Sequence, residues 1–243
     1  MRDRRLTIRR AAEFNRPHLW LDRSTRPTPR PPPSDRMAST AALTRCAALL
    51  AGGGVAAIPT DTLYGLAASI RAPEAVARIL RIKTRDPGAG IPILVESAAQ
   101  AAQIANLSPA ARRLARAFWP GALTLVLPAR PGVDRRLLGP ERTVGVRVPA
   151  SGVVRELIRL VGAPLTGTSA NLHNQPPPIT AQAATQAVGT LVDLVLDGGP
   201  GAGAPSTVVD MAQDPPLILR AGAVDAPSIQ AVVPAVRPSG DGG

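Results

Sequence analysis

The sequence predicts an α/β fold in which helices and short strands are layered around a single β-sheet. Helical and apolar strand patterns alternate along most of the chain, and no internal repeat is visible. Of the 243 residues, 45% are hydrophobic but only 2% are aromatic, so the core must be built from Ala, Val, Leu and Ile. We expect about eight strands and six helices in this arrangement.

The expected elements begin and end at recognisable boundary residues. Gly52-Gly53-Gly54 closes the first helix, and Pro73 suits the first turn of the second. Ser108 and Thr180 are good N-caps for later helices, and Pro59 ends the first buried strand. The predicted order is helix 41–50, strand 55–58, helix 73–83, strand 91–95, helix 108–119, strands 123–127 and 144–148, helix 153–161, strand 164–166, helix 180–188, strands 191–196, 207–209 and 217–219, and helix 227–233.

The two ends of the chain differ in composition from the rest. Residues 1–36 hold ten arginines against four acidic residues and include a proline-rich run, which predicts a disordered basic tail over 1–37. Patterned sequence starts directly after Met37, which is therefore a candidate for the true start. We expect one folded domain over 38–234 and a second loose tail over 235–243.

Deleting residues 1–36 should leave the melting temperature and the activity of the protein nearly unchanged, because this segment cannot bury a core. The melting temperature of the shortened chain can be compared with that of the full chain. A fall of more than about 5 °C, which corresponds to roughly 1–2 kcal/mol in a domain of this size, would mean that the tail packs.

Charge and rare residues narrow the function classes. The net charge of +11 suits an anionic ligand such as a nucleotide or RNA. Cys46 is the only cysteine and should be a packed, inert thiol, and two histidines without a Cys/His cluster predict no protein-built metal site. No apolar run is long enough to span a membrane.

Lys83 is the only lysine among the 28 basic residues of the chain, and the other 27 are arginines. A compact ammonium can serve where a planar guanidinium cannot, so this lysine is either a functional group or a surface residue retained by chance. As a helix-end cation it would contribute only about 0.3–1 kcal/mol to stability. On that basis, replacing it should impair catalysis and leave stability almost unchanged.

Two glycine clusters do not fit the phosphate-binding motifs. Gly52-Gly53-Gly54 lacks the Gly-Lys-Ser/Thr ending of a P-loop and precedes a strand. The cluster at 199–203 also precedes a strand, which excludes a Rossmann fingerprint there. Both clusters are interpreted as loops.

Three polar segments are candidates for ligand binding. Thr60-Asp61-Thr62 follows a buried strand, at an edge where open α/β sheets bind ligands, or it is a capped turn. Lys83-Thr84-Arg85 suits a polyphosphate, or places two cations favourably at a helix end. Thr166–Asn171 has only small side chains, so a ligand can approach its backbone, or it is a Ser/Asn turn. No Gly-x-Ser-x-Gly elbow surrounds Ser169, which argues against a nucleophile.

In order along the chain, these segments resemble the YrdC-type threonylcarbamoyl-AMP synthases. The resemblance covers roughly residues 40–224 and implies a single YrdC-like domain: an open, twisted mixed sheet with flanking helices and a concave, positively charged cleft. The chain resembles the short form, without the additional C-terminal domain of some relatives. The matching pieces are 59–65, 83–85 with 91–95, 118–121 with 123–124, 143–149, 168–171, 206–210, and 218–220 with Gly222.

The resemblance implies an L-threonylcarbamoyladenylate synthase, a cytoplasmic nucleotidyltransferase. It would convert L-threonine, bicarbonate and ATP, with Mg²⁺, into threonylcarbamoyl-AMP and pyrophosphate for the modification of a tRNA adenosine next to the anticodon. The downstream tRNA threonylcarbamoyl transferase machinery, and tRNA or double-stranded RNA itself, are expected partners; no membrane is. Implied catalytic residues are Lys83 and Arg85, implied ATP-binding residues are Lys83, Arg85, Thr143, Ser169, Asn171 and Arg220, and implied threonine-binding residues are Thr60, Thr62, Arg147, Gly167 and Ser206.

Four positions depart from the family pattern. Gly90 stands where many members have Pro, Glu96 where many have His, Pro177 where a serine can contact the nucleotide, and Pro205 where many have Glu.

Two alternative functions remain open. One is a module that binds double-stranded RNA or tRNA without catalysis. The other is a carbamoyl-transfer relative that acts in metal-centre maturation.

Overall fold

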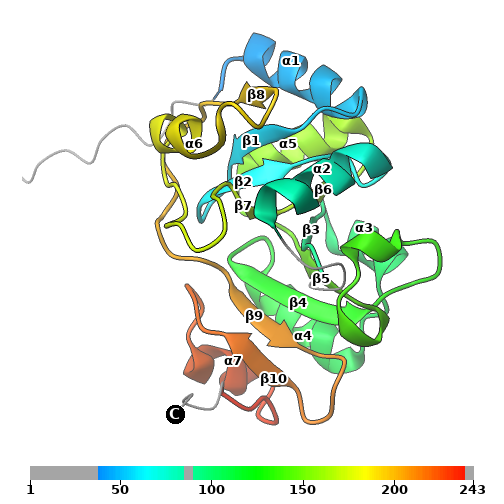
Figure 1. Ribbon diagram of the computed structural model, residues 1–243. Helices are drawn as coiled ribbons and strands as arrows, with labels where there is room; N and C mark the ends of the chain where they lie inside the picture. Colours follow the sequence, from blue (N-terminus) through cyan, green and yellow to red (C-terminus); the bar gives the residue numbers. More distant parts are fainter. Residues whose placement is uncertain (1–37, 85–89, 239–243) are drawn as a thin grey trace, which may run out of the picture. The chain divides into compact units, whose positions relative to one another are not determined.

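The computed structural model describes residues 38–84 and 90–238, and within these ranges the strands form two sheets (Figure 1). The smaller sheet has the order β7-β2-β1-β8 and the larger sheet the order β10-β9-β4-β5-β3-β6. The elements are α1 (Thr40–Ala51), β1 (Ala56–Pro59), β2 (Tyr64–Ala67), α2 (Pro73–Lys83), β3 (Ile93–Leu94), α3 (Ala98–Ile104), α4 (Pro109–Phe118), β4 (Leu123–Pro128), the short 3-10 helices Arg135–Leu137 and Pro140–Arg142, β5 (Thr143–Arg147), α5 (Gly152–Val161), β6 (Leu165–Thr166), β7 (Thr168–Ser169), α6 (Ala181–Val188), β8 (Leu194–Val195), β9 (Thr207–Asp210), β10 (Leu217–Arg220) and α7 (Ala226–Val232).

The expected single sheet is therefore corrected to two sheets, which are joined through their backbones. The chain beyond β2 leaves the smaller sheet and pairs with β6 of the larger one: Thr166 N donates to Ala68 O at 2.9 Å, and Ser69 forms a bridge with Leu165. Gly167 separates β6 from β7, so the chain changes sheets within one residue. A Cβ at Gly167 would lie 2.5 Å from the Leu94 side chain, which explains why glycine occupies this crossing point.

The helices cover both faces of the smaller sheet. Alternate residues of the first strand belong to different apolar clusters, as strand geometry requires: Ala57 faces the larger cluster and Ile58 the smaller one. The smaller cluster packs α1 and α5 on one face, and the larger cluster includes α2, α4 and both sheets. Cys46 lies fully buried in the smaller cluster, and burial raises its pKa to about 11, so its thiol is inert as expected.

Local signals placed most helices well. Ser108 Oγ accepts a hydrogen bond from Ala111 N at 3.2 Å, and Thr180 Oγ1 accepts one from Ala183 N at 3.1 Å, so both predicted N-caps are confirmed. The predicted strands agree less well with the structure. The expected strands 91–95 and 191–196 are reduced to the two-residue β3 and β8, and β2, α3 and β7 were not predicted.

The packed domain extends beyond its expected end at residue 234. Val236 is buried, and Arg237 is bound to the start of β10: its N–H donates to Pro216 O at 2.8 Å, and its carbonyl accepts from Ile218 N at 2.9 Å. Val236 and Arg237, which were expected to lie in the loose C-terminal tail, therefore belong to the packed domain. Residues 1–37, with the predicted basic tail, lie outside the described part of the chain. Among the described helices, none has the length and apolar character needed to cross a bilayer.

Candidate active site

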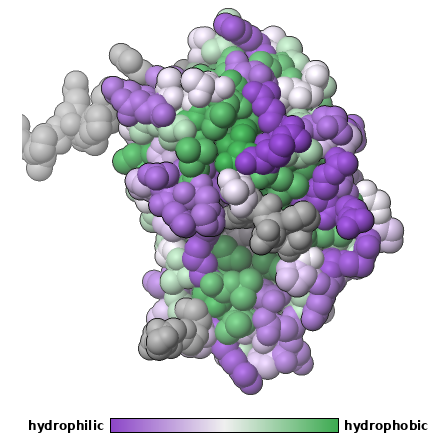
Figure 2. Space-filling view, in the orientation of Figure 1, coloured by the Kyte–Doolittle hydropathy of each residue, from purple (hydrophilic) through white to green (hydrophobic). Residues whose placement is uncertain are grey.

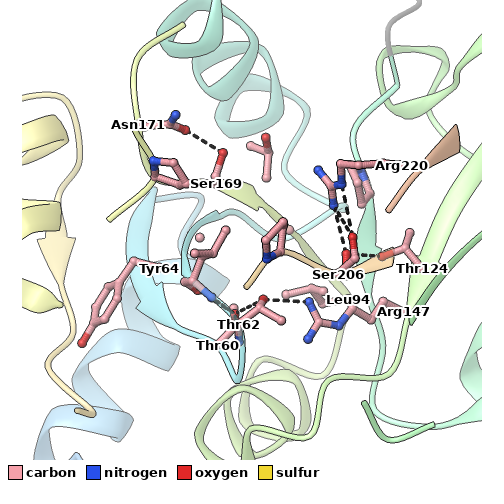
Figure 3. A pocket seen from close by; sticks show the side chains of 17 residues that line it. Thr60, Thr62, Tyr64, Leu94, Thr124, Arg147, Ser169, Asn171, Ser206 and Arg220 are labelled. Carbon is pink, nitrogen blue, oxygen red and sulfur yellow. Dashed lines mark hydrogen bonds between the residues drawn. The ribbon is translucent and has the colours of Figure 1, made fainter. Parts of the chain in front are cut away.

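A cavity of about 320 Å³ lies where the ends of β1, β2, β5, β7, β9 and β10 meet (Figure 3). In Figure 3, Thr62 and Arg147 lie side by side at the bottom of the view. Ser206 and Arg220 lie above Arg147 on the right, and Ser169 and Asn171 lie at the upper left. Residues far apart in the sequence are thus brought together. The expected site residues that line the cavity are Thr60, Thr62, Arg147, Gly167, Ser169, Asn171, Ser206 and Arg220.

The Thr60 hydroxyl is fully engaged within its own loop. Its oxygen accepts from the backbone N–H groups of Thr62 and Leu63, each at 3.1 Å, and its only proton is donated to Leu63 O at 2.6 Å. The Thr60 and Thr62 hydroxyl oxygens also lie 3.0 Å apart. Thr60 consequently shapes the turn and has no proton left for a ligand.

Arg147 is buried at the end of β5 and is held on three sides. Its Nε donates to Gly121 O at 2.8 Å, one terminal nitrogen donates to Thr62 Oγ1 at 3.0 Å, and the other donates to Asp61 Oδ2 at 2.6 Å. Burial lowers the pKa of Arg147, while the charge of Asp61 opposes that change. A guanidinium carries five N–H bonds, so two remain here, one on each terminal nitrogen.

Ser206 and Arg220 form the opposite wall. Ser206 Oγ lies 2.9 Å from Thr124 Oγ1, and the Arg220 guanidinium donates to both Ser206 O, at 2.8 Å, and Ser206 Oγ, at 3.1 Å. These bonds connect β4, β9 and β10 at the cavity. Thr124 also lines the cavity, although it was expected only as part of a segment that matches the family.

Lys83 does not lie on the surface. Only 4% of the residue is exposed, and its ammonium contacts four oxygens at the end of β7 and just after it: Ser169 O at 3.0 Å, Ser169 Oγ at 3.3 Å, Asn171 O at 2.7 Å and Asn171 Oδ1 at 2.6 Å. The interpretation as a chance surface lysine is therefore wrong. Lys83 does lie at a helix end, but its burial removes the reason for expecting little effect on stability. Lys83 is absent from the cavity wall itself and supports two residues that form it.

Thr143 lies outside this cavity, in a neighbouring one of about 540 Å³. The two cavities share Pro92, Thr124 and Arg220. The walls of the second cavity include the apolar side chains of Val208 and Leu219 and the carboxylates of Glu141 and Asp210. Figure 2 shows hydrophobic surface below the centre of this face, over the region of β4 and β9.

The loop from β8 to β9, residues 198–206, passes behind the Thr60–Leu63 turn, and we call it the glycine strap. Gly203 N donates to Thr62 O at 3.0 Å, and Ala202 N donates to Asp61 O at 3.3 Å. A Cβ at Gly201 would lie 2.5 Å from Thr62 O, so only glycine allows this approach. The interpretation of this glycine cluster as a loop is confirmed, and it supports the site.

Comparison with known proteins follows the same segments. A family model named Sua5/YciO/YrdC, with the description "Telomere recombination", matches residues 48–222, which is more than half of the chain. The chain belongs to the Sua5/YciO/YrdC family. The resemblance noted in the sequence and the α/β fold class are both confirmed.

Named relatives of this Sua5/YciO/YrdC protein are threonylcarbamoyl-AMP synthases. The Bacillus subtilis synthase is 35% identical over 194 residues, covering 79% of this chain and 56% of the relative. A putative synthase of Mycobacterium leprae is 39% identical over 194 residues, covering 79% of this chain and 88% of the relative. The structure of Pyrococcus abyssi Sua5 complexed with L-threonine has a TM-score of 0.77 at 35% identity, and covers 81% of this chain and 58% of that one. The chain thus spans little more than half the length of the Bacillus and Pyrococcus proteins.

The departures from the family pattern lie mostly at the two cavities. Pro177 and Pro205 line the first cavity, and Gly90 lines the second. Gly90 has φ = +65°, a conformation that the ring of a proline excludes, so the backbone here is specific to glycine. Glu96 lies in a separate groove beside α3. Arg85 lies outside the described residues, and its place near the phosphates stays a prediction.

Proposed function

We propose that this Sua5/YciO/YrdC chain is a threonylcarbamoyl-AMP synthase. The observation that carries the proposal is the first cavity, where a buried arginine with two unused N–H bonds lies beside the Thr62 hydroxyl. The names of the relatives and the threonine complex of the Pyrococcus protein support the same assignment.

The first cavity suits a small amino acid. Its volume of about 320 Å³ is at the lower end of ligand pockets, which range from about 300 to 1,000 Å³. We assign the two remaining N–H bonds of Arg147 to the carboxylate of L-threonine, because arginine often binds carboxylates through two parallel bonds. Thr62 would accept from the amino or hydroxyl group, with Gly167 and Ser206 completing the walls. Thr60 acts by shaping the turn.

The second cavity suits the nucleoside of ATP. Its apolar side chains can take a base, Thr143 lies in it, and Arg220 stands at its border with the first cavity. The phosphates would then lie at that border, near Ser169 and Asn171, with Lys83 holding this loop and Arg85 contributing charge. Threonine's amine and bicarbonate give a carbamate and water. A carbamate oxygen then forms a bond to the α-phosphorus of ATP as the bond to pyrophosphate breaks.

This reaction needs no protein nucleophile, which agrees with the chemistry of the cavity walls. The protein's task is to position two anionic reactants and to neutralise charge that develops on the phosphates. Within the described residues, no group of His, Cys, Asp and Glu could hold a metal ion. Mg²⁺ that enters with ATP would be held largely by the phosphates and water. The product would supply tRNA modification in the cytoplasm, with tRNA and the transferase machinery as partners.

The central test is pyrophosphate release from ATP by the purified chain, with and without bicarbonate, in the presence of threonine or valine. Valine has the shape of threonine but lacks the hydroxyl, and sites that hydrogen-bond a hydroxyl reject such analogues strongly. We expect threonine with bicarbonate to stimulate release at least about a hundredfold more than valine does. Equal stimulation by both amino acids would contradict the assignment of the first cavity. RNA binding without any pyrophosphate release would favour the non-catalytic alternative.

A further inference from the structure

Asp61 contacts a residue of the first cavity but does not line the cavity itself. Its Oδ2 accepts a hydrogen bond of 2.6 Å from Arg147, which lines the cavity. We propose that Asp61 is a positioning residue that holds the Arg147 guanidinium in one orientation and thereby sets the affinity of the site for the amino-acid carboxylate. This inference rests on the proposed function.

The pair between Arg147 and Asp61 is the most buried ion pair among the described residues. Its side chains are 6% and 18% exposed, whereas the side chains in the other described pairs are 24–59% exposed. Taking two charges out of water opposes folding, so a buried pair is weak support for stability. A role in orienting a functional group accounts better for its presence here.

Asp61 does not serve the turn in which it lies. Aspartate in a turn usually accepts hydrogen bonds from the backbone N–H groups that follow it. In this turn the Thr60 hydroxyl takes that part, since it accepts from the amides of Thr62 and Leu63. Asp61 Oδ1 is buried and has no hydrogen-bond partner within the described ranges. The carboxylate is therefore directed at Arg147 alone, while the backbone carbonyl of Asp61 is held by the glycine strap.

Three acceptors orient the guanidinium, and they differ in strength. Gly121 O and the Thr62 hydroxyl are neutral, and their bonds measure 2.8 and 3.0 Å. The bond to Asp61 is the shortest and the only one to a charged group, and charge-assisted bonds are roughly twice as strong as neutral ones. Asp61 is thus the strongest of the three constraints on where the remaining N–H bonds point.

The same arrangement orders the neighbouring hydroxyl. Arg147 donates to the Thr62 hydroxyl, which lies 3.0 Å from the Thr60 hydroxyl. Because Arg147 holds the Thr62 hydroxyl, the position of this group at the cavity also depends on the guanidinium. Loss of Asp61 would therefore disturb recognition of both the carboxylate and the donor group of the amino acid.

The test is Asp61→Asn, assayed by pyrophosphate release at saturating ATP and bicarbonate. We expect the KM for threonine to rise about tenfold, because the asparagine Oδ1 can still accept from Arg147 but lacks the charge that makes this bond the strongest of the three. The kcat should change only a few-fold and the KM for ATP should stay constant. If the amide variant does not fold, Asp61→Ala takes its place. A wild-type KM for threonine, or an equal rise in both KM values, would overturn the proposal.

Asp193→Asn is a matched control. Asp193 also pairs with an arginine, Arg78, and accepts from the backbone N–H of Val55, but it lies at the other end of β1. Its variant should keep the KM for threonine whatever it does to the melting temperature. A rise equal to that of Asp61→Asn would show that any lost ion pair has this effect, and would overturn the proposal.

A double variant separates action through Arg147 from direct action. In an Arg147→Met background, adding Asp61→Asn should raise the KM for threonine no further, because its target is already gone. Effects that multiply would overturn the proposal. Where turnover is too slow, the rise in melting temperature with added threonine gives the same comparison. If wild-type protein gives no threonine-dependent turnover or stabilisation, the proposed function itself fails, which is a distinct result.

Discussion

Replacing Lys83 by methionine should lower the rate of pyrophosphate release by about a hundredfold or more. Methionine keeps a long apolar stem but lacks the ammonium, so four oxygens of Ser169 and Asn171 lose their common donor. The loop would rearrange, and both residues form part of the cavity wall. Because the lost contacts are buried, the free energy of unfolding should also fall by about 1–3 kcal/mol.

Lys83→Arg should impair the enzyme too, although it keeps the charge. The planar guanidinium is larger than the ammonium and must enter a space bounded by oxygens 2.6–3.3 Å from Nζ. Arg81→Met is the matched control, since Arg81 lies in the same helical turn but is exposed. The measurements are the rate of pyrophosphate release and the melting temperature of Lys83→Met, Lys83→Arg and Arg81→Met. A wild-type rate for Lys83→Arg would show that the lone lysine has no special role.

Replacing Arg147 by methionine should have the second large effect. Removing one partner of a buried ion pair typically costs about 3–5 kcal/mol, because the other charge is left uncompensated. Here that charge is Asp61, and the neutral acceptors Thr62 and Gly121 also lose their donor. Denaturant unfolding should therefore show a large loss of stability, together with a greatly raised KM for threonine.

The double variant Arg147→Met with Asp61→Asn should regain part of that stability, since it removes the uncompensated carboxylate. Its KM for threonine should stay high. Arg159→Met is a suitable control: Arg159 pairs with Glu156 on the surface of α5, so both quantities should remain near wild type. Unchanged stability in Arg147→Met would contradict the burial and pairing on which this expectation depends.

The fold was predictable where its signals are local. N-caps and first-turn prolines mark α2, α4 and α6, and these helices were located within a residue or two. Helix α3 had a signal that we overlooked: Ser97 accepts from Gln100 N, in the Ser-x-x-Gln spacing of a capping box. Strand β2 reads Tyr-Gly-Leu-Ala and has little strand propensity of its own. It exists because β1 and β7 pair with it on both sides.

For the site, the sequence indicates which residues take part but not how they contact one another. The order of short motifs indicates most residues that line the cavity, but composition and spacing do not reveal which side chains form hydrogen bonds with each other. Asp61 stands in a candidate segment, but its contact with Arg147 is not predictable from the sequence because the two residues are 86 positions apart. Likewise, a helical pattern ending at Lys83 looks the same whether the ammonium meets solvent or a loop that is 86 positions distant. Such contacts arise only when the two sheets come together.

The glycine strap also bears on the order in which this protein becomes active as it is synthesised. The Thr60–Leu63 turn leaves the ribosome early, but the amides that support it belong to residues 202 and 203. The opposite wall comes later still, with Ser206 and Arg220 on the last two strands. Contacts between such distant segments form slowly, because a long loop must close first. The cavity can therefore be completed only after Arg220 has been synthesised, when the domain is nearly complete.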